Sequence, residues 1–293
     1  MTLSQSRALD HVVLPVVDLD VAAATYARLG FTVTPRARHP FGTGNRLIQL
    51  DGNFLELLSV VAPQDIPAPT ATGFSFAAFN RDWADKNGEG MSMLVLRSAD
   101  ADADRAAFAA LNLPAYDRFD FGRKAVQPDG SEREVAFSLA FTGSDLMPEC
   151  GFFTCQNRFP ENFWKPDYQR HANGAIRLTT VVITSKDPAD HHEFLGGFSG
   201  ARDLAMTSFA LDVPVPGGMI SVLNPQGWMA RFGGGSPDFD DGARFFGLRF
   251  AVADLAATRA LLAENAVATR DWHGAIIVDA PAAHGVTIAF DQA

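Results

Sequence analysis

The sequence has few cysteines and no cluster of positive charge, and each absence excludes a class of protein. Cys150 and Cys155 are the only two cysteines, too few for a disulfide scaffold or for a zinc site of four thiolates. Lys and Arg number 24 against 34 Asp and Glu, a net charge of −10, and no run of basic residues occurs. Because a nucleic-acid partner requires a basic surface, none is expected.

Long apolar runs are also missing. No stretch approaches the length needed to span a bilayer, so no membrane partner is expected. The first residues, MTLSQSRALDHVV, contain no apolar segment ahead of the first predicted strand and do not resemble a secretory signal. A cytoplasmic location is the expectation that follows.

What the sequence does contain is phenylalanine, with 24 residues against 3 tyrosines. Phenylalanine suits dry interiors and apolar pockets, because its ring has no hydroxyl group to satisfy. The chain of 293 residues is long enough for one large domain or two medium ones. Composition does not decide between a packed core and an apolar binding site.

One order of elements, strand–helix–strand–strand–strand, is repeated along the chain. The segments VDLDVAAATYARL and VADLAATRALLAEN are similar helix starts from the first and last copies, so we predict four βαβββ modules. The first copy is the clearest, with an aspartate N-cap before its helix and Gly30 as the helix stop. Its predicted elements are the strands Leu9–Val17, Phe31–Pro35, Asn45–Leu50 and Asn53–Val60 and the helix Val21–Leu29.

The four modules are predicted to pair into two halves. Residues 1–156 form the first half, with the candidate functional cleft, and residues 175–293 form a second, degenerate half. Residues 157–174 between them are irregular and aromatic, unlike a flexible Gly/Ser linker, so this connector is expected to pack against both halves. The segment Ala62–Glu89 is interpreted as a long loop that acts as a lid, a pocket wall or a plain insertion.

Two strands of the first module carry a candidate polar site. Leu9, His11 and Val13 are expected on one face of the first strand, and Glu56 lies between apolar neighbours on the fourth. A buried carboxylate is costly unless it is paired, hydrogen-bonded or metal-bound. A structural His11–Glu56 pair, or a salt bridge from Glu56 to an arginine, explains the pattern as well as a functional site does.

Three segments carry a family resemblance: DHVVLPVVDLDVAAATYARLGF, RHPFGTGNRLIQL with its His-x-x-Gly-Thr-x-Asn element, and GNFLELLSV. Together they resemble the glyoxalase-like branch of the vicinal-oxygen-chelate superfamily, which includes glyoxalases, dioxygenases and bleomycin-resistance proteins. The resemblance covers Asp10–Val60. It implies an α+β fold of four βαβββ modules that pair into two cupped mixed β-sheets with helices outside. It also implies that His11 and Glu56 hold one divalent metal, namely Fe, Mn, Ni or Zn.

The later modules depart from the family pattern. Metals in this superfamily usually take three or four protein ligands, some of them from the second module. Here Ser92 lies near the expected histidine position of that module, and Phe153 or Thr154 near the expected glutamate position. His11 and Glu56 alone fall short of a two-His-one-carboxylate triad. A metal site and a metal-free cleft therefore both stay open.

Further polar side chains are candidates for binding a substrate. His39, Thr43 and Asn45 belong to the HPFGTGN turn, where they rim the cleft or simply bond the turn backbone. Gln156 ends a predicted strand and His171 lies in the connector, and an ordinary hydrogen-bonding role explains each of them equally well.

Two functions follow from these residues. The first is an enzyme of the glyoxalase or dioxygenase type that acts on a small, partly apolar molecule, through a metal at His11 and Glu56 or with Glu56 as a catalytic general base. The second is a metal-free protein that binds and sequesters a small molecule, as bleomycin-resistance proteins do. A homodimer is a further expectation, because proteins with paired modules often assemble through their sheets.

Overall fold

The chain folds as four consecutive strand–helix–strand–strand–strand modules. The structure is a computed structural model and describes residues 6–126, 132–240 and 242–293. Module one consists of β1 (Leu9–Pro15), α1 (Leu19–Arg28), β2 (Ala37–Arg38), β3 (Thr43–Gln49) and β4 (Phe54–Val60), and module two of β5 (Met93–Arg97), α3 (Ala101–Ala110), β6 (Phe119–Val126), β7 (Glu132–Thr142) and β8 (Gly151–Asn157). Module three consists of β9 (Ala175–Thr184), α5 (His192–Ser199), β10 (Ala205–Met206), β11 (Ala210–Val215) and β12 (Gly218–Leu223), and module four of β13 (Arg244–Val252), α7 (Leu255–Glu264), β14 (Arg270–Trp272), β15 (Ala275–Val278) and β16 (Thr287–Gln292).

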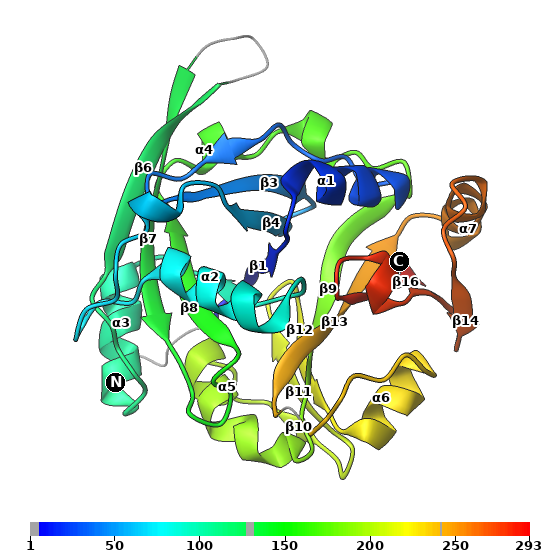
Figure 1. Cartoon of the computed structure of the whole chain (residues 1–293). Helices are drawn as coiled ribbons and strands as arrows, with labels where there is room; N and C mark the ends of the chain where they lie inside the picture. The colour runs from blue at the N-terminus through cyan, green and yellow to red at the C-terminus, as the bar shows by residue number, and fades with distance from the viewer. Residues whose placement is uncertain (1–5, 127–131, 241) are drawn as a thin grey trace.

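The modules pair into two mixed sheets of eight strands each (Figure 1). The strand orders are β2-β3-β4-β1-β5-β8-β7-β6 and β10-β11-β12-β9-β13-β16-β15-β14, so both sheets have the same topology. In each sheet the first strands of the two modules, β1 with β5 and β9 with β13, pair antiparallel at the centre. The predicted α+β fold of four modules and two sheets is confirmed.

The helices of the modules pack between the two sheets. Asp18, Asp100 and Asp254 accept hydrogen bonds from backbone amides of the first turns of α1, α3 and α7, as expected of N-caps. The buried sides of these helices join one core with the outer faces of both sheets. Phe108 of α3 and Phe198 of α5 meet there with ring centroids 6.2 Å apart, which ties the two sheets together.

Two further helices follow the last strands of modules one and three. These are α2 (Phe76–Asn87) and α6 (Pro225–Phe232), so the segment Ala62–Glu89, predicted as a loop, contains a helix. The side chain of Ser75 caps α2, and Phe76 is buried against the concave face of the first sheet. In the described parts of the chain, no helix is long and apolar enough to cross a bilayer. The remaining short helices are η1 (Pro63–Asp65), α4 (Pro160–Phe163), η2 (Pro166–Gln169), η3 (Pro188–His191) and η4 (Ala280–Ala282).

The expected strand Phe31–Pro35 does not form, and this prediction was wrong. Thr32 instead bonds the connector: its backbone amide donates to Nδ1 of His171 at 3.0 Å, and its hydroxyl donates to the carbonyl of Arg170. Tertiary contacts therefore override the strand propensity of this segment. The short strand β2 forms a few residues later.

A β-bulge in β1 changes which side chains share a face. Leu9 pairs with Leu96 and His11 with Val95, so Asp10 is the extra residue of the bulge. Leu9 consequently packs into the core between the sheets, whereas His11 faces the concave side. The expectation that Leu9 shares a face with His11 was wrong, because it assumed unbroken alternation.

The connector at residues 157–174 contacts elements on both sides of it. Nε2 of Gln169 donates to the carbonyl of Leu50 at 2.7 Å, and the hydroxyl of Thr258 donates to the carbonyl of Asn173 at 2.7 Å. These bonds hold it against β3 and α7. The division into two domains at this connector stays a prediction.

Candidate active site

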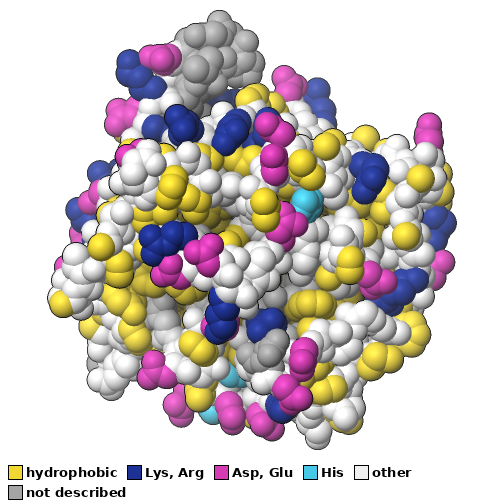
Figure 2. Space-filling view, viewed as in Figure 1, with side chains coloured by type: hydrophobic (Ala, Val, Ile, Leu, Met, Phe, Trp, Pro, Cys, Tyr) yellow, Lys and Arg dark blue, Asp and Glu magenta, His cyan; other side chains and the backbone are white. Residues whose placement is uncertain are grey.

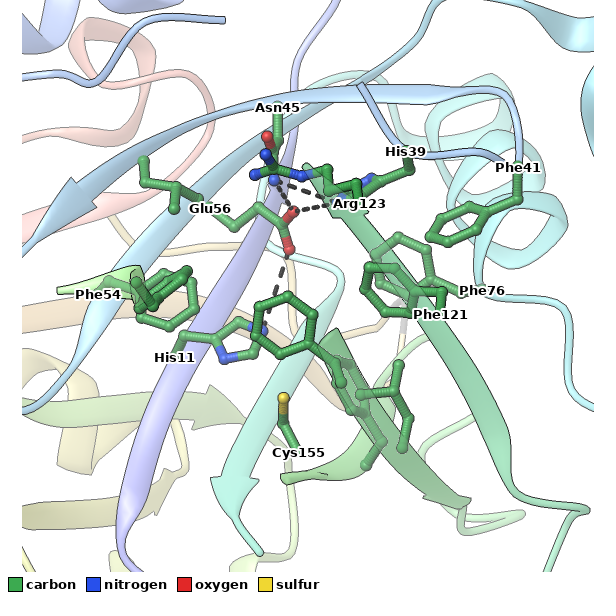
Figure 3. Close-up of a pocket in the computed structure, with 15 residues that line it drawn as sticks. His11, His39, Phe41, Asn45, Phe54, Glu56, Phe76, Phe121, Arg123 and Cys155 are labelled. Atoms are coloured by element: carbon green, nitrogen blue, oxygen red, sulfur yellow. Dashed lines mark hydrogen bonds and ion pairs between the residues drawn. The ribbon is translucent and has the colours of Figure 1, made fainter. Parts of the chain in front are cut away.

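The concave face of the first sheet, closed by α2, encloses a cavity of about 50 Å³ (Figure 3). Seven of its 15 lining residues are phenylalanines, contributed by the turn between β2 and β3, by β4, α2, β6, β7 and β8, and by the connector. The cavity therefore uses part of the large phenylalanine content of the chain. Its nitrogen- and oxygen-bearing side chains are His11, His39, Asn45, Glu56 and Arg123.

Glu56 lies at the centre of these polar side chains and is only 5% exposed. Nδ2 of Asn45 donates to its Oε1 at 2.6 Å, and Nε2 of His39 lies 3.6 Å from the same oxygen. Nε2 of His11 lies 4.0 Å from the other oxygen, Oε2 (Figure 3). The structure thus brings together four of the residues that the sequence singled out.

The bulge gives His11 an adjacent acidic partner. Nδ1 of His11 lies 2.7 Å from Oδ2 of Asp10, whose Oδ1 is 3.4 Å from Nε of Arg97. Because an ionised carboxylate only accepts hydrogen bonds, Nδ1 of His11 carries the proton of this bond, and Nε2 is the ring atom that faces Glu56. The ring of Phe54 stacks on the imidazole with centroids 4.2 Å apart and fixes its plane.

His39 is held as a neutral imidazole. Its Nδ1 donates to Oγ1 of Thr43 at 2.8 Å, while its Nε2 accepts from Nδ2 of Asn45 at 3.3 Å. Burial lowers the pKa of His39 to about 4, Glu56 opposes this shift, and Arg123 adds to it. Thr43 is fully buried and serves to orient His39.

Arg123 was not predicted from the sequence. It follows Phe119 and Phe121 at alternate positions of β6, and this period-two pattern is the signal that could have placed it on the concave face. Its Nε atom is buried and has no hydrogen-bond partner among the described residues. Burial lowers the pKa of Arg123, while Glu56 raises it.

Two of the aromatic walls come from segments interpreted as loop and connector. Phe76 belongs to α2, and Phe163 to α4 of the connector, where its ring lies 5.1 Å from that of Phe54. Cys155 adds a thiol to the wall. Burial raises the pKa of this thiol well above its usual value, so the thiol stays protonated. Sequence reasoning missed the two rings because their segments lack a clear periodicity.

Two other candidates, Gln156 and His171, lie away from the cavity, and so does Ser92, which stands near the expected histidine position of module two. Gln156 is positioned at the start of α3, where Nε2 donates to the carbonyl of Ala99 at 3.0 Å. His171 bridges the connector and module one, since Nε2 donates to the carbonyl of Gln49 at 2.8 Å. Ser92 precedes β5 and donates to Asn80 at 2.6 Å. Each of the three has a structural hydrogen bond that accounts for its place.

The donors around Glu56 do not fit the ligand set of a divalent metal. Nε2 of His39 faces the amide of Asn45. Among the described lining residues, the opposite module offers only rings, Leu139, the cationic Arg123 and the protonated thiol of Cys155. Within the described ranges, no group of three His, Cys, Asp or Glu side chains is placed to hold a metal ion. A catalytic metal needs about three protein ligands, and His11 and Glu56 supply two.

Comparison with known sequences now adds the family. The sequence profile of the glyoxalase-like domain matches residues 9–197, more than half of the chain. The chain belongs to the glyoxalase-like domain family. The resemblance seen in residues 10–60 is therefore confirmed. A comparison with curated proteins gives no match.

Solved structures share the fold of this glyoxalase-like protein. A hypothetical protein from Staphylococcus aureus superimposes with a TM-score of 0.68 at 14% identity, covering 97% of this chain and 99% of that one. An Mn(II)-bound glyoxalase from Novosphingobium aromaticivorans gives 0.58 at 11% identity, with coverages of 98% and 82%. A mutant of 4-hydroxymandelate synthase from Streptomyces coelicolor gives 0.58 at 12% identity, with coverages of 98% and 92%. At such identities the likeness is one of fold.

Proposed function

We propose that this glyoxalase-like protein is an enzyme that moves a proton on a small, partly apolar molecule held in the cavity of the first sheet. The observation that supports this proposal is the pair of His11 and Glu56, whose Nε2 and Oε2 atoms lie 4.0 Å apart in a wall of phenylalanine. A substrate placed beside both atoms would have Nε2 to take a proton from carbon and return it, and the carboxylate of Glu56 to pass a proton between the oxygens of the substrate.

The surroundings give the two groups different roles. Asp10 holds the proton of His11 on Nδ1, so Nε2 is free to accept a proton from a C–H bond next to a carbonyl. Asn45 occupies Oε1 of Glu56 and leaves Oε2 directed at the cavity. The electron pair of the broken C–H bond passes to the carbonyl oxygen as an enolate. Where the carbon that lost its proton carries a hydroxyl group, the hydroxyl proton passes through Oε2 of Glu56 to the enolate oxygen, and Nε2 of His11 returns its proton to the former carbonyl carbon, which completes an isomerisation. The geometry suits an isomerase or lyase of this kind.

A divalent metal at His11 and Glu56 remains the family-based alternative. Solved relatives of the same fold include an Mn(II)-bound glyoxalase, but the donor set here is short of a ligand, and we assign no step to a metal. Sequestration of a small molecule is the second candidate, supported by the ring-lined wall. A cytoplasmic location and a homodimer stay predictions from the sequence.

Hydrogen–deuterium exchange of small carbonyl compounds tests the proposal. The probes are 2-oxobutyrate, dihydroxyacetone phosphate, 2,3-pentanedione and dihydroxyacetone, each followed in D₂O by proton NMR with the wild-type protein. We expect enzyme-dependent exchange at the carbon next to the carbonyl, and its loss in Glu56→Gln and in His11→Gln. Asp212→Asn, a carboxylate in the second sheet, is the matched control and should keep the activity.

Two results would overturn the proposal. Saturable binding of a probe without any exchange would favour sequestration. Stoichiometric Mn, Fe, Ni or Zn in the wild-type protein, absent from both the Glu56→Gln and the His11→Gln variant by elemental analysis, would favour the metal alternative.

A further inference from the structure

We propose that the substrate is an organic anion and that a cationic groove beside the cavity binds its carboxylate or phosphate group. This inference rests on the proposed function, since it names the class of molecule that the cavity accepts. The groove has a volume of about 640 Å³ and lies between β2, β3, the end of β6 and the connector. It shares Asn45, Leu47, Arg123 and Phe163 with the cavity, so the two spaces meet at a common wall.

The charge of the groove is opposite to that of the chain. The sequence has ten more acidic than basic side chains, yet among the residues that the structure describes no Asp or Glu lines this groove. Figure 2 shows several Lys and Arg side chains along the upper edge of the molecule, with Asp and Glu side chains among them. The basic residues that line the groove are Arg36, Arg38, Arg123, Lys124 and Lys165.

Most of these cations lack a carboxylate partner. Lys124 pairs with Glu132 of the same hairpin at 2.8 Å. By contrast, Arg38, Arg123 and Lys165 form no ion pair with any residue in the described parts of the chain. Glu56 acts on Arg123 from the cavity without forming an ion pair with it. Gathering like charges without paired carboxylates is unfavourable, and proteins tend to accept such a cost at functional sites.

The second sheet provides an internal comparison. Its own groove, of about 490 Å³, is also lined by two arginines. There Arg231 binds Asp212 through contacts of 2.8 and 2.7 Å, and Arg249 binds Asp291 through contacts of 2.9 and 2.6 Å. Both guanidinium groups are neutralised within the fold. The chain thus pairs the arginines of one groove and leaves those of the other open to a ligand.

Arg123 indicates how an anion would be oriented. Its buried Nε has no partner, and a buried donor without an acceptor is costly, so an anionic oxygen arriving from the groove would satisfy it. Glu56 in the cavity would repel the same anion, which keeps the charged group in the groove. The cavity of about 50 Å³ then receives the uncharged end, a few heavy atoms in size.

Binding of matched probe pairs tests this inference. 2-Oxobutyrate is compared with its neutral analogue 2,3-pentanedione, and dihydroxyacetone phosphate with dihydroxyacetone, by calorimetry at low and high salt. We expect one anion of the two pairs to bind more tightly than its neutral analogue, and more weakly as salt increases. The pair that shows the difference tells whether the groove takes a carboxylate or a phosphate.

Variants locate the effect. Arg123→Met should weaken anion binding about tenfold, and Arg38→Met or Lys165→Met roughly threefold each, because the first loses a buried charge-assisted hydrogen bond and the others lose exposed attraction. Arg231→Met, from the second groove, is the matched control and should not change binding. Circular dichroism checks that every variant is folded.

The two proposals can fail separately. Equal binding of anions and neutral analogues, or equal binding by Arg123→Met and Arg231→Met, overturns the groove even if proton exchange is observed. Anion binding that depends on Arg123 but is not followed by exchange keeps the groove and overturns the proton transfer.

Discussion

The two sheets have the same topology, but their concave faces differ. In the first, α2 leaves a cavity with Glu56 in it; in the second, α6 fills the corresponding space with Trp228 and Phe232, which are fully buried and stack at 4.1 Å. A methyl group on Gly247 would come within 3.1 Å of Phe232 and 3.2 Å of Trp228. The absence of a side chain at Gly247 therefore permits this packing.

The polar position of the first sheet has a counterpart in the second. Glu56 pairs with Val13 in the ladder of β1 and β4, and Ser221 pairs with Val182 in the ladder of β9 and β12. Ser221 donates to Asp212, which is bound by Arg231, whereas Glu56 faces uncharged donors and a cavity. The fold itself therefore does not create the site. A carboxylate without a bound cation, beside space for a ligand, makes the difference.

The strongest test of this contrast is Glu56→Gln against Asp212→Asn. If only the first sheet is catalytic, Glu56→Gln should lower the rate of proton exchange by about 100- to 10,000-fold, the usual contribution of a general acid or base. Asp212→Asn should leave the rate unchanged. Initial exchange rates of the two variants are measured by NMR at equal protein concentrations. Equal losses of rate in both variants would contradict a catalytic site confined to the first sheet.

Trp228→Ala should be the most destabilising change in the second concave face. It removes a fully buried ring and is expected to lower the free energy of unfolding by about 3–5 kcal/mol. Phe76→Ala in the first should cost less, roughly half as much, because part of its ring borders a cavity and has fewer partners to lose. Urea unfolding of both variants gives the two values. A larger loss for Phe76→Ala would mean that the first face is packed as tightly as the second.

The buried His39 predicts a pH dependence of stability. Its pKa is about 4 in the folded state, against the usual 6.5 of a histidine in an unfolded chain, so between these pH values the unfolded chain binds a proton that the folded chain does not. The free energy of unfolding should therefore fall as the pH falls from about 6.5 to about 4, by up to roughly 3 kcal/mol from this group. Unfolding of His39→Gln at both pH values should lack this part of the loss. An identical dependence in the variant would show that His39 is not buried as a neutral ring.

Arginine replacements give the smallest expected difference. Arg231→Met leaves the half-buried Asp212 without its partner and should cost about 1 kcal/mol after allowance for solvent screening. Arg123→Met removes a half-buried cation with an unsatisfied Nε and should leave the free energy of unfolding within about 0.5 kcal/mol of wild type. Thermal unfolding of the two variants side by side shows which of them loses more stability. A larger loss for Arg123→Met would mean that Arg123 has a stabilising partner within the fold.

Much of the fold could be predicted because it is encoded locally. Three of the four helix starts follow from aspartate caps and apolar periodicity, and the central strands follow from runs of β-branched residues. The strand expected at Phe31–Pro35 failed because its bonding partner, the connector with His171, lies far along the chain. The bulge at Asp10 could not be predicted for a related reason, because it is defined by how β1 pairs with β5, a strand about 80 residues further along the chain.

The candidate site was predicted only in its first-module part. His11, His39, Asn45 and Glu56 belong to one recognisable stretch of sequence and meet as that stretch folds. Arg123 reaches them from β6, and no property of the residue itself distinguishes it from the other arginines. Gln156 looked equally suitable in the sequence, but its strand turns it toward α3. Which polar side chains converge depends on tertiary contacts.

The connector has a consequence for how the protein is made. Its Phe163 completes the wall of a cavity whose other walls belong to residues 11–155. A ribosome adds residues from the N-terminus, so both modules of the first sheet are synthesised before this ring exists. The nascent first sheet therefore emerges with an open pocket, and ligand binding by a growing chain should start only after the connector has left the exit tunnel.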